Sequence, residues 1–242
     1  MKRTERRHLK ENELQIFARQ TRELFEDRRR EVTIGIGILG VIAVVGIGYY
    51  AWRERVQAKA HTILAEALAV RDARVGPPPA AGAPPIAGPN FATDRERSQA
   101  ALTKFKVVAD TYPKTDAGFF ARYQEAATYM LLGNPTQAAA TYQQVIDRAG
   151  SNIYGQMARL GLAEAQARAG QYDQAINTFK ELALRKDGPL PVDGILMQLG
   201  RTYLDAGKRT DAQQTFNRLV EEFPESPYTG DARRELENLK KT

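Results

Sequence analysis

The strongest constraint on the fold is a spacing of 37 residues that recurs along the C-terminal part of this 242-residue chain. Glycine, alanine and aromatic residues each return with this spacing in three successive stretches. One period earlier, the same spacing predicts Ala101, Phe105 and Val108 as core positions. Because independent positions agree on one period, we infer a stack of similar structural units. The recurring positions are Gly133, Gly170 and Gly207; Ala138, Ala175 and Ala212; and Tyr142, Phe179 and Phe216.

Each unit has the composition of a helical hairpin. The recurring glycine ends the first helix in the left-handed conformation that glycine adopts at low cost. Small residues on the two helices allow close approach, and the aromatic residue fills the space between one hairpin and the next. Pro113 and its counterpart Pro224 stop the second helix. One hairpin alone leaves an apolar face in water, so we predict an all-α solenoid of stacked hairpins. The small residues on the first helices are Ala126, Ala163 and Gly200.

This pattern resembles the tetratricopeptide repeat family, whose repeats have about 34 residues. In this chain each repeat is longer by three residues, which fall between hairpins. The resemblance spans roughly residues 94–241. Gln166 stands where the family has an aromatic residue, and Glu125 stands where leucine is usual. The last repeat carries nearly the whole signature, in Leu199, Gly200, Tyr203, Gly207, Ala212, Phe216 and Pro224.

An uncharged apolar stretch of 21 residues runs from Val32 to Trp52. As a helix it is about 31 Å long, close to the ~30 Å hydrocarbon core of a bilayer. We predict an uncleaved transmembrane anchor, because the stretch is longer than the apolar region of a signal peptide and follows some thirty residues. Side chains typical of the membrane interface flank it, namely Arg28, Arg29 and Arg30 on one side and Tyr49, Tyr50 and Trp52 on the other.

The excess of Lys and Arg before the apolar stretch predicts a cytoplasmic N-terminus and an exported C-terminal part. We therefore expect residues 1–31 to be a basic cytoplasmic tail, 32–52 the anchor, and 53–75 a helix that continues from it. Residues 76–90 form a linker rich in Pro, Gly and Ala, and residues 91–242 form the repeat domain. In the tail, Leu14, Phe17, Leu24 and Phe25 share one face of a short helix, which is either a docking or membrane-surface helix or a solvated tail with incidental helicity.

The junctions of the repeat domain carry signals of their own. Thr93 and Glu96 form a capping box at the start of a helix. The 53–75 helix is expected to be the missing first helix of the unit that ends at Pro113. Ser226 as cap and Pro227 in the first turn are expected to begin a polar capping helix at the C-terminal end.

In the tetratricopeptide register, the first helix of each hairpin lines a concave face that holds an extended or helical peptide. The alternative is that several of these residues belong to the core. No cofactor or small-molecule substrate is predicted. The expected groove residues are Phe120, Tyr123, Met130, Met157, Leu160, Glu164, Arg168, Met197, Arg201 and Asp205.

Composition argues against several kinds of chemistry. The chain has no cysteine and two histidines far apart, so we expect neither a metal site nor a Ser–His nucleophile pair. Half of the net charge of +6 comes from residues 1–31, which leaves the rest of the chain nearly balanced and does not indicate nucleic-acid binding. We therefore predict no enzyme activity.

The whole layout resembles the ancillary subunit of the bacterial Sec translocon, a family with one inner-membrane anchor and a periplasmic repeat domain. Leu14-Gln15-Ile16-Phe17, Tyr49-Tyr50-Ala51-Trp52-Arg53 and the 58–69 stretch carry the resemblance. It implies a scaffold that passes exported chains to periplasmic chaperones. Two alternatives stay open. The first is an envelope-assembly scaffold, because the repeat junctions of Tol–Pal and outer-membrane assembly scaffolds are similar to Tyr112-Pro113-Lys114-Thr115 and Phe223–Tyr228. The second is a structural subunit of a large envelope machine, since repeat scaffolds serve many roles.

Overall fold

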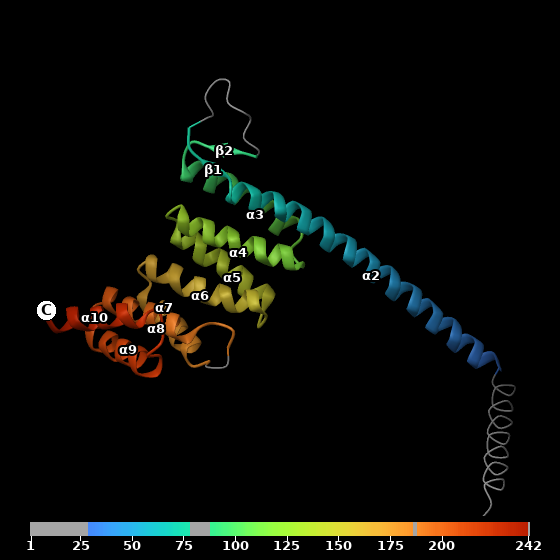
Figure 1. The fold of residues 1–242 in the computed structure, drawn as a ribbon. Helices are drawn as coiled ribbons and strands as arrows, with labels where there is room; N and C mark the ends of the chain where they lie inside the picture. Colours follow the sequence, from blue (N-terminus) through green and yellow to red (C-terminus); the bar gives the residue numbers. More distant parts are fainter. Residues whose placement is uncertain (1–28, 78–87, 186–187, 242) are drawn as a thin grey trace, which may run out of the picture. The chain divides into compact units, whose positions relative to one another are not determined.

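The computed structural model describes residues 29–77, 88–185 and 188–241 (Figure 1). These residues form nine helices, labelled α2 to α10, and two strands of two residues each. The chain divides into a first unit, residues 1–55, and a second unit, residues 56–242, and each is considered by itself. The predicted amphipathic helix of the tail and Arg28 lie outside the described residues.

Helix α2, Arg29–Arg71, contains the described part of the first unit. Its stretch Thr33–Arg71 is long and apolar enough to cross a membrane, and among the described helices it alone meets that condition. The large apolar side chains from Ile34 to Trp52 are exposed, as Val44 at 70% illustrates. Arg30 lies in the first turn, and the rings of Tyr49 and Trp52 lie 6.0 Å apart between centroids. An isolated helix with such a surface is unfavourable in water.

The last four turns of α2 belong to the second unit and pack on α3, Asp94–Thr111. Leu64 and two alanines of α2 share an apolar cluster with Phe105 and Val108 of α3. This agrees with the expectation that the helix after the apolar stretch completes the first hairpin. Thr93 caps α3, since its hydroxyl accepts a hydrogen bond from the Glu96 amide at 3.1 Å.

A short clasp that the sequence analysis does not predict closes the insert between α2 and α3. Strand β1, Arg74–Val75, pairs in parallel with β2, Asn90–Phe91. The Gly76 amide donates to the Phe91 carbonyl at 3.0 Å, and the Asn90 side chain donates to the Gly76 carbonyl at 3.1 Å. The two ends of the Pro-rich segment therefore lie side by side. Residues 78–87 lie outside the described part.

Three hairpins follow, each with its second helix antiparallel to its first (Figure 1). The recurring glycines that end the first helices have φ of 78°, 77° and 73°, as predicted. At each of them the next amide reaches back to a carbonyl of the helix, as in Lys208 to Tyr203 at 2.8 Å. The helices are α4, Asp116–Leu131, with α5, Pro135–Ala149; α6, Ile153–Arg168, with α7, Tyr172–Ala183; and α8, Val192–Asp205, with α9, Arg209–Glu222.

The recurring aromatic residues are buried, but they fill different spaces. A β-carbon on Gly161 would lie 2.5 Å from the ring of Tyr142, so Tyr142 packs against the next hairpin, as predicted. A β-carbon on Gly200 would lie 2.3 Å from the ring of Phe216, so Phe216 instead packs between the two helices of its own hairpin. The stack ends after this hairpin, and α10 covers it.

Helix α10, Thr229–Lys241, begins two residues later than predicted. The Ser226 hydroxyl accepts from the Tyr228 amide at 3.1 Å and donates to Asp193 on α8. Residues 223–228 therefore form a turn, and the helix starts only where the Thr229 hydroxyl bonds the Phe223 carbonyl at 2.8 Å. Leu236 and Leu239 pack α10 on the cluster formed by α7 to α9.

Candidate protein-binding surface

The first helices of the second and third hairpins, α6 and α8, lie beside each other and enclose a hollow of about 190 Å³. Four of the predicted groove residues line it: Glu164 and Arg168 from α6, and Arg201 and Asp205 from α8. Phe179, Ala167, Gln198 and Thr202 complete the lining. We call this hollow the α6–α8 hollow.

The repeat explains why these four charges alternate in sign. Arg201 occupies the position of Glu164 one period later, and Asp205 occupies that of Arg168. The acidic residue precedes the basic one on α6, whereas the basic residue precedes the acidic one on α8. Each pair is four residues apart, so its members lie one turn apart on one face of their helix. A carboxylate and a guanidinium therefore alternate along each helix and from one helix to the other.

Glu164 is the most unusual of the four. It is half-buried, and within the described ranges no hydrogen bond or ion pair reaches its carboxylate. Burial raises the pKa of Glu164 above its usual 4.5, an effect that the nearby charge of Arg168 opposes. At the rim, Arg201 donates to Asp231 of α10 at 3.4 Å. A half-buried carboxylate without a hydrogen-bond partner loses part of its hydration free energy, which an incoming donor would restore.

Two tyrosines of the preceding hairpin interact electrostatically with Glu164. Tyr123 of α4 and Tyr142 of α5 have ring centroids 5.5 Å apart. Burial raises the pKa of both phenols, and the negative charge of Glu164 raises it further. Both groups therefore stay neutral and act as hydrogen-bond donors or acceptors.

The other predicted groove residues divide between surface and core. Phe120, Met130, Met157 and Leu160 are half-buried on the first helices. Phe120 lies against Tyr154 at 6.3 Å between ring centroids, and Leu160 packs on the core of the last hairpins. Met197 must be removed from the predicted groove: it is 1% exposed and belongs to the core, because this face of α8 turns toward α7 and α9.

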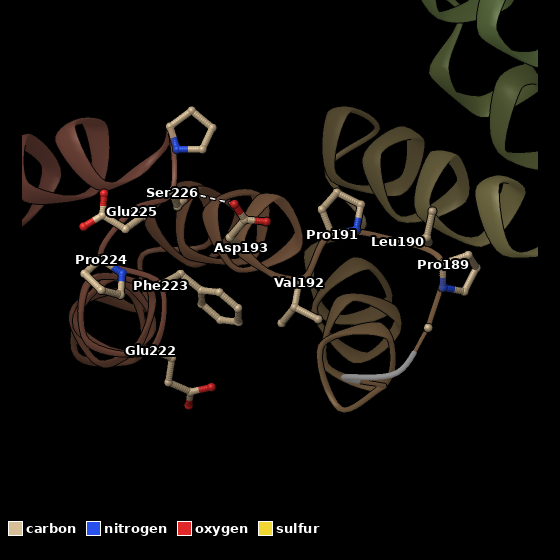
Figure 2. A pocket seen from close by; sticks show the side chains of 12 residues that line it. Pro189, Leu190, Pro191, Val192, Asp193, Glu222, Phe223, Pro224, Glu225 and Ser226 are labelled. Atoms are coloured by element: carbon tan, nitrogen blue, oxygen red, sulfur yellow. Dashed lines mark hydrogen bonds between the residues drawn. The ribbon is translucent and has the colours of Figure 1, made fainter.

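A second hollow, which the sequence analysis missed, lies between two loops at the same end of the last hairpin (Figure 2). It measures about 1020 Å³ and is lined by residues 188–193, before and at the start of α8, and by residues 222–227, after α9. The Ser226 hydroxyl donates to Asp193 at 2.6 Å and joins the two loops. Both loops can be recognised in the sequence by their prolines, which are Pro189 and Pro191 in the first loop and Pro224 and Pro227 in the second. Each loop by itself indicates only a helix boundary.

In the described part of the chain, no group of three His, Asp or Glu side chains is placed to hold a metal ion.

Known protein families and structures match this arrangement. The tetratricopeptide repeat-like domain matches residues 25–189, more than half of the chain, and the tetratricopeptide repeat matches residues 195–226. This chain belongs to the tetratricopeptide repeat-like family. No curated protein matches it.

Among solved structures, the nearly identical TPR-like repeats of a putative kinesin light chain from Podosopora anserina are 16% identical to this chain. The TM-score is 0.53, over 60% of this chain and 79% of that one. A tetratricopeptide repeat protein from Parabacteroides merdae is 16% identical, with a TM-score of 0.48 over 61% of this chain and 55% of that one. The likeness to the first shows a shared fold. Membership of the tetratricopeptide repeat-like family makes the repeat domain a protein-binding scaffold, of a kind that is typically non-catalytic.

Proposed function

We propose that this protein is a membrane-anchored scaffold that binds polypeptides on the face formed by α4, α6 and α8. The observation that carries the proposal is the α6–α8 hollow, where Glu164 has no hydrogen-bond partner among the described residues although Arg168, Arg201 and Asp205 line the same space. The four charged side chains surround one concave space, where Glu164 is half-buried and the other three are exposed. Concave sites with a few convergent polar groups are where ligands bind.

The anchor is the second part of the proposal. The exposed apolar side chains of α2 and the interface residues Tyr49, Tyr50 and Trp52 support insertion in a bilayer. The Lys and Arg bias before the span supports a cytoplasmic N-terminus and an exported repeat domain in the bacterial inner membrane. A reporter enzyme that is active only outside the cytoplasm, fused after Thr242, should be active. An inactive C-terminal fusion with an active N-terminal fusion would reverse the topology.

The resemblance to the ancillary Sec translocon subunit supports a place beside the translocation channel, where the scaffold passes exported chains to periplasmic chaperones. Purification of the full chain in mild detergent should recover the channel and a periplasmic folding factor. Recovery of Tol-linked or peptidoglycan-linked proteins alone would favour the envelope-assembly alternative. One stoichiometric complex would favour a structural subunit of a large machine.

A further inference from the structure

The junction between the second and third of these hairpins is wider than the junction before it. Eight residues, 184–191, join α7 to α8, whereas three residues, 150–152, join α5 to α6. Relative to the period of 37, α7 ends three residues early and α8 begins two residues late. The larger hollow, lined by residues 188–193 and 222–227, lies at this widened junction (Figure 2), and we call it the junction hollow.

The walls of the junction hollow are ordered by their own contacts. Proline occupies four positions of the two loops and fixes φ there at about −65°. The Ser226 hydroxyl donates to Asp193 at 2.6 Å and connects one loop to the other. The ring of Tyr228 lies against the first turn of α8, where a β-carbon on Gly194 would be 3.3 Å from it. A surface that is ordered before binding loses little conformational entropy when a partner arrives.

Apolar groups form much of the lining of the junction hollow. Val192 is buried, Leu190 and Phe223 are half-buried, and the four proline rings are exposed. Two large apolar side chains next to the same loops, Leu184 and Tyr228, are 76% and 40% exposed. Exposed apolar surface that is bordered by polar groups is typical of sites where another protein docks.

The charges of the junction hollow have one sign. Its lining includes Asp193, Glu222 and Glu225, and none of the described residues that line it is basic. Arg218 donates to Glu222 at 2.8 Å, and Asp193 accepts from Ser226. Glu225 is exposed, and in the parts of the chain that the structure describes it joins no ion pair. The hollow therefore attracts a guanidinium or ammonium group and repels a carboxylate or an anionic lipid headgroup.

The size and the lining together indicate the kind of partner. A volume of about 1020 Å³ lies at the upper end of the ~300–1000 Å³ typical of small-molecule pockets, so several side chains of a partner protein fit in it. Proline rings pack well against aromatic rings. Arginine forms paired hydrogen bonds with carboxylates, and it contributes strongly to protein interfaces together with tryptophan and tyrosine.

We propose that the junction hollow is a second protein-docking site, separate from the α6–α8 hollow, and that it binds a partner segment in which an aromatic side chain is flanked by arginines. The aromatic ring packs on the prolines and Phe223, and an arginine pairs with Glu225. The inference goes beyond the proposed binding of polypeptides by α4, α6 and α8. With two separate sites, the scaffold can hold two proteins at the same time.

The test uses the full chain in nonionic detergent micelles and fluorescein-labelled, end-blocked peptides of nine residues, with fluorescence anisotropy as the readout. The parent peptide has Arg-Trp-Arg at its centre between glycine and serine residues. One comparison peptide has glutamates in place of both arginines, and another has serine in place of the tryptophan. We expect the parent to bind at least about tenfold more tightly than either, since a hydrogen bond to a charged group or an aromatic anchor is worth at least that factor. Empty micelles correct for binding to detergent.

Matched variants connect the effect to the junction hollow. Glu225→Arg should weaken the parent peptide at least about tenfold and strengthen the glutamate peptide at least about threefold, a gain that a misfolded protein cannot produce. Glu237→Arg makes the same change of charge at an exposed position of α10 outside the lining, and should change both affinities by less than about twofold. Glu164→Met in the α6–α8 hollow should leave both affinities within about twofold as well, because the two sites are separate.

Equal binding of the three peptides, no binding of the parent at about 1 mM, or equal effects of Glu225→Arg and Glu237→Arg would overturn the inference. Loss of parent binding in Glu164→Met would overturn it too, by assigning the peptide to the α6–α8 hollow. If sedimentation shows that the unaltered chain dimerises and that Glu225→Arg is monomeric, the occupant is a second copy of this chain and the proposed partner is wrong. Each of these outcomes leaves the proposed function of the α6–α8 hollow in place.

Discussion

Arg122 and Glu125 form an ion pair inside the second unit, where Nη1 of Arg122 donates to Oε2 of Glu125 at 2.6 Å. The Glu125 side chain is 5% exposed and that of Arg122 is 10% exposed. The other guanidinium nitrogen of Arg122 reaches Asp110 on α3. The pair explains why glutamate stands where the family has leucine: the leucine of the later repeats is replaced by an ionic link between two hairpins.

Replacing Glu125 with leucine should therefore destabilise the protein, although leucine is the family residue. Arg122 would stay buried with only Asp110 as partner, and we expect a loss of about 2–4 kcal/mol in the free energy of unfolding. The double variant Arg122→Leu/Glu125→Leu should recover most of it. Urea unfolding of the full chain in detergent, followed by circular dichroism, measures both. A neutral single variant, or a double variant as unstable as the single one, would contradict this account.

Gly200 and Gly230 offer a matched pair of helical glycines. Gly200→Ala should cost at least about 2 kcal/mol, because its β-carbon would lie 2.3 Å from the buried ring of Phe216. Gly230→Ala in α10 meets nothing within 4 Å and should be neutral or stabilise by up to about 1 kcal/mol. Thermal unfolding compares the two. Similar shifts of Tm for both variants would show that the ring of Phe216 moves aside without a cost in stability.

The structural roles that could be predicted from the sequence alone were those of residues that recur with the 37-residue period. The period of 37 identified the buried Ala101, Phe105 and Val108 and the glycines at the helix ends, because hairpin packing imposes the same requirement in every unit. The same register brought Glu164, Arg168, Arg201 and Asp205 into one list, and the structure brings them into one hollow.

Features that depend on contacts outside the repeat could not be predicted. The clasp between Arg74–Val75 and Asn90–Phe91 involves two-residue strands, too short to show a strand pattern. Met197 is apolar and falls at a groove position, so only the packing of α7 and α9 assigns it to the core. The hollow beside Ser226 arises where two separate loops meet, and neither loop indicates the other.

Glu164 should make stability depend on pH. Its pKa in the folded protein lies above its usual 4.5, so between these two values the folded state keeps a proton that the unfolded state has lost. Stability therefore falls as pH rises through this window. Glu164→Gln should stabilise the protein by at most about 1 kcal/mol near pH 7 and change little below about pH 4. Urea unfolding at both pH values, with exposed Glu181→Gln as control, measures the difference; a loss of stability near neutral pH would contradict it.

Ser226→Ala should loosen the junction between α8 and α10. The variant loses the 2.6 Å bond to Asp193, and we expect local opening to become easier by about 1–2 kcal/mol. Hydrogen exchange of the amides in residues 223–229 should accelerate accordingly. Ser98→Ala on α3 should leave that exchange unchanged, and unaltered exchange in both variants would show that the bond does not hold the loops together.

Photo-crosslinking from the α6–α8 hollow in intact membranes tests the central claim most directly. A photoreactive phenylalanine at position 205 should crosslink the full-length chain to other polypeptides, and Glu164→Met in the same chain should weaken those crosslinks. The same group at the exposed position 217 of α9 should give few. Equal crosslinking from both positions, or none from position 205, would contradict the assignment of this face as the binding surface.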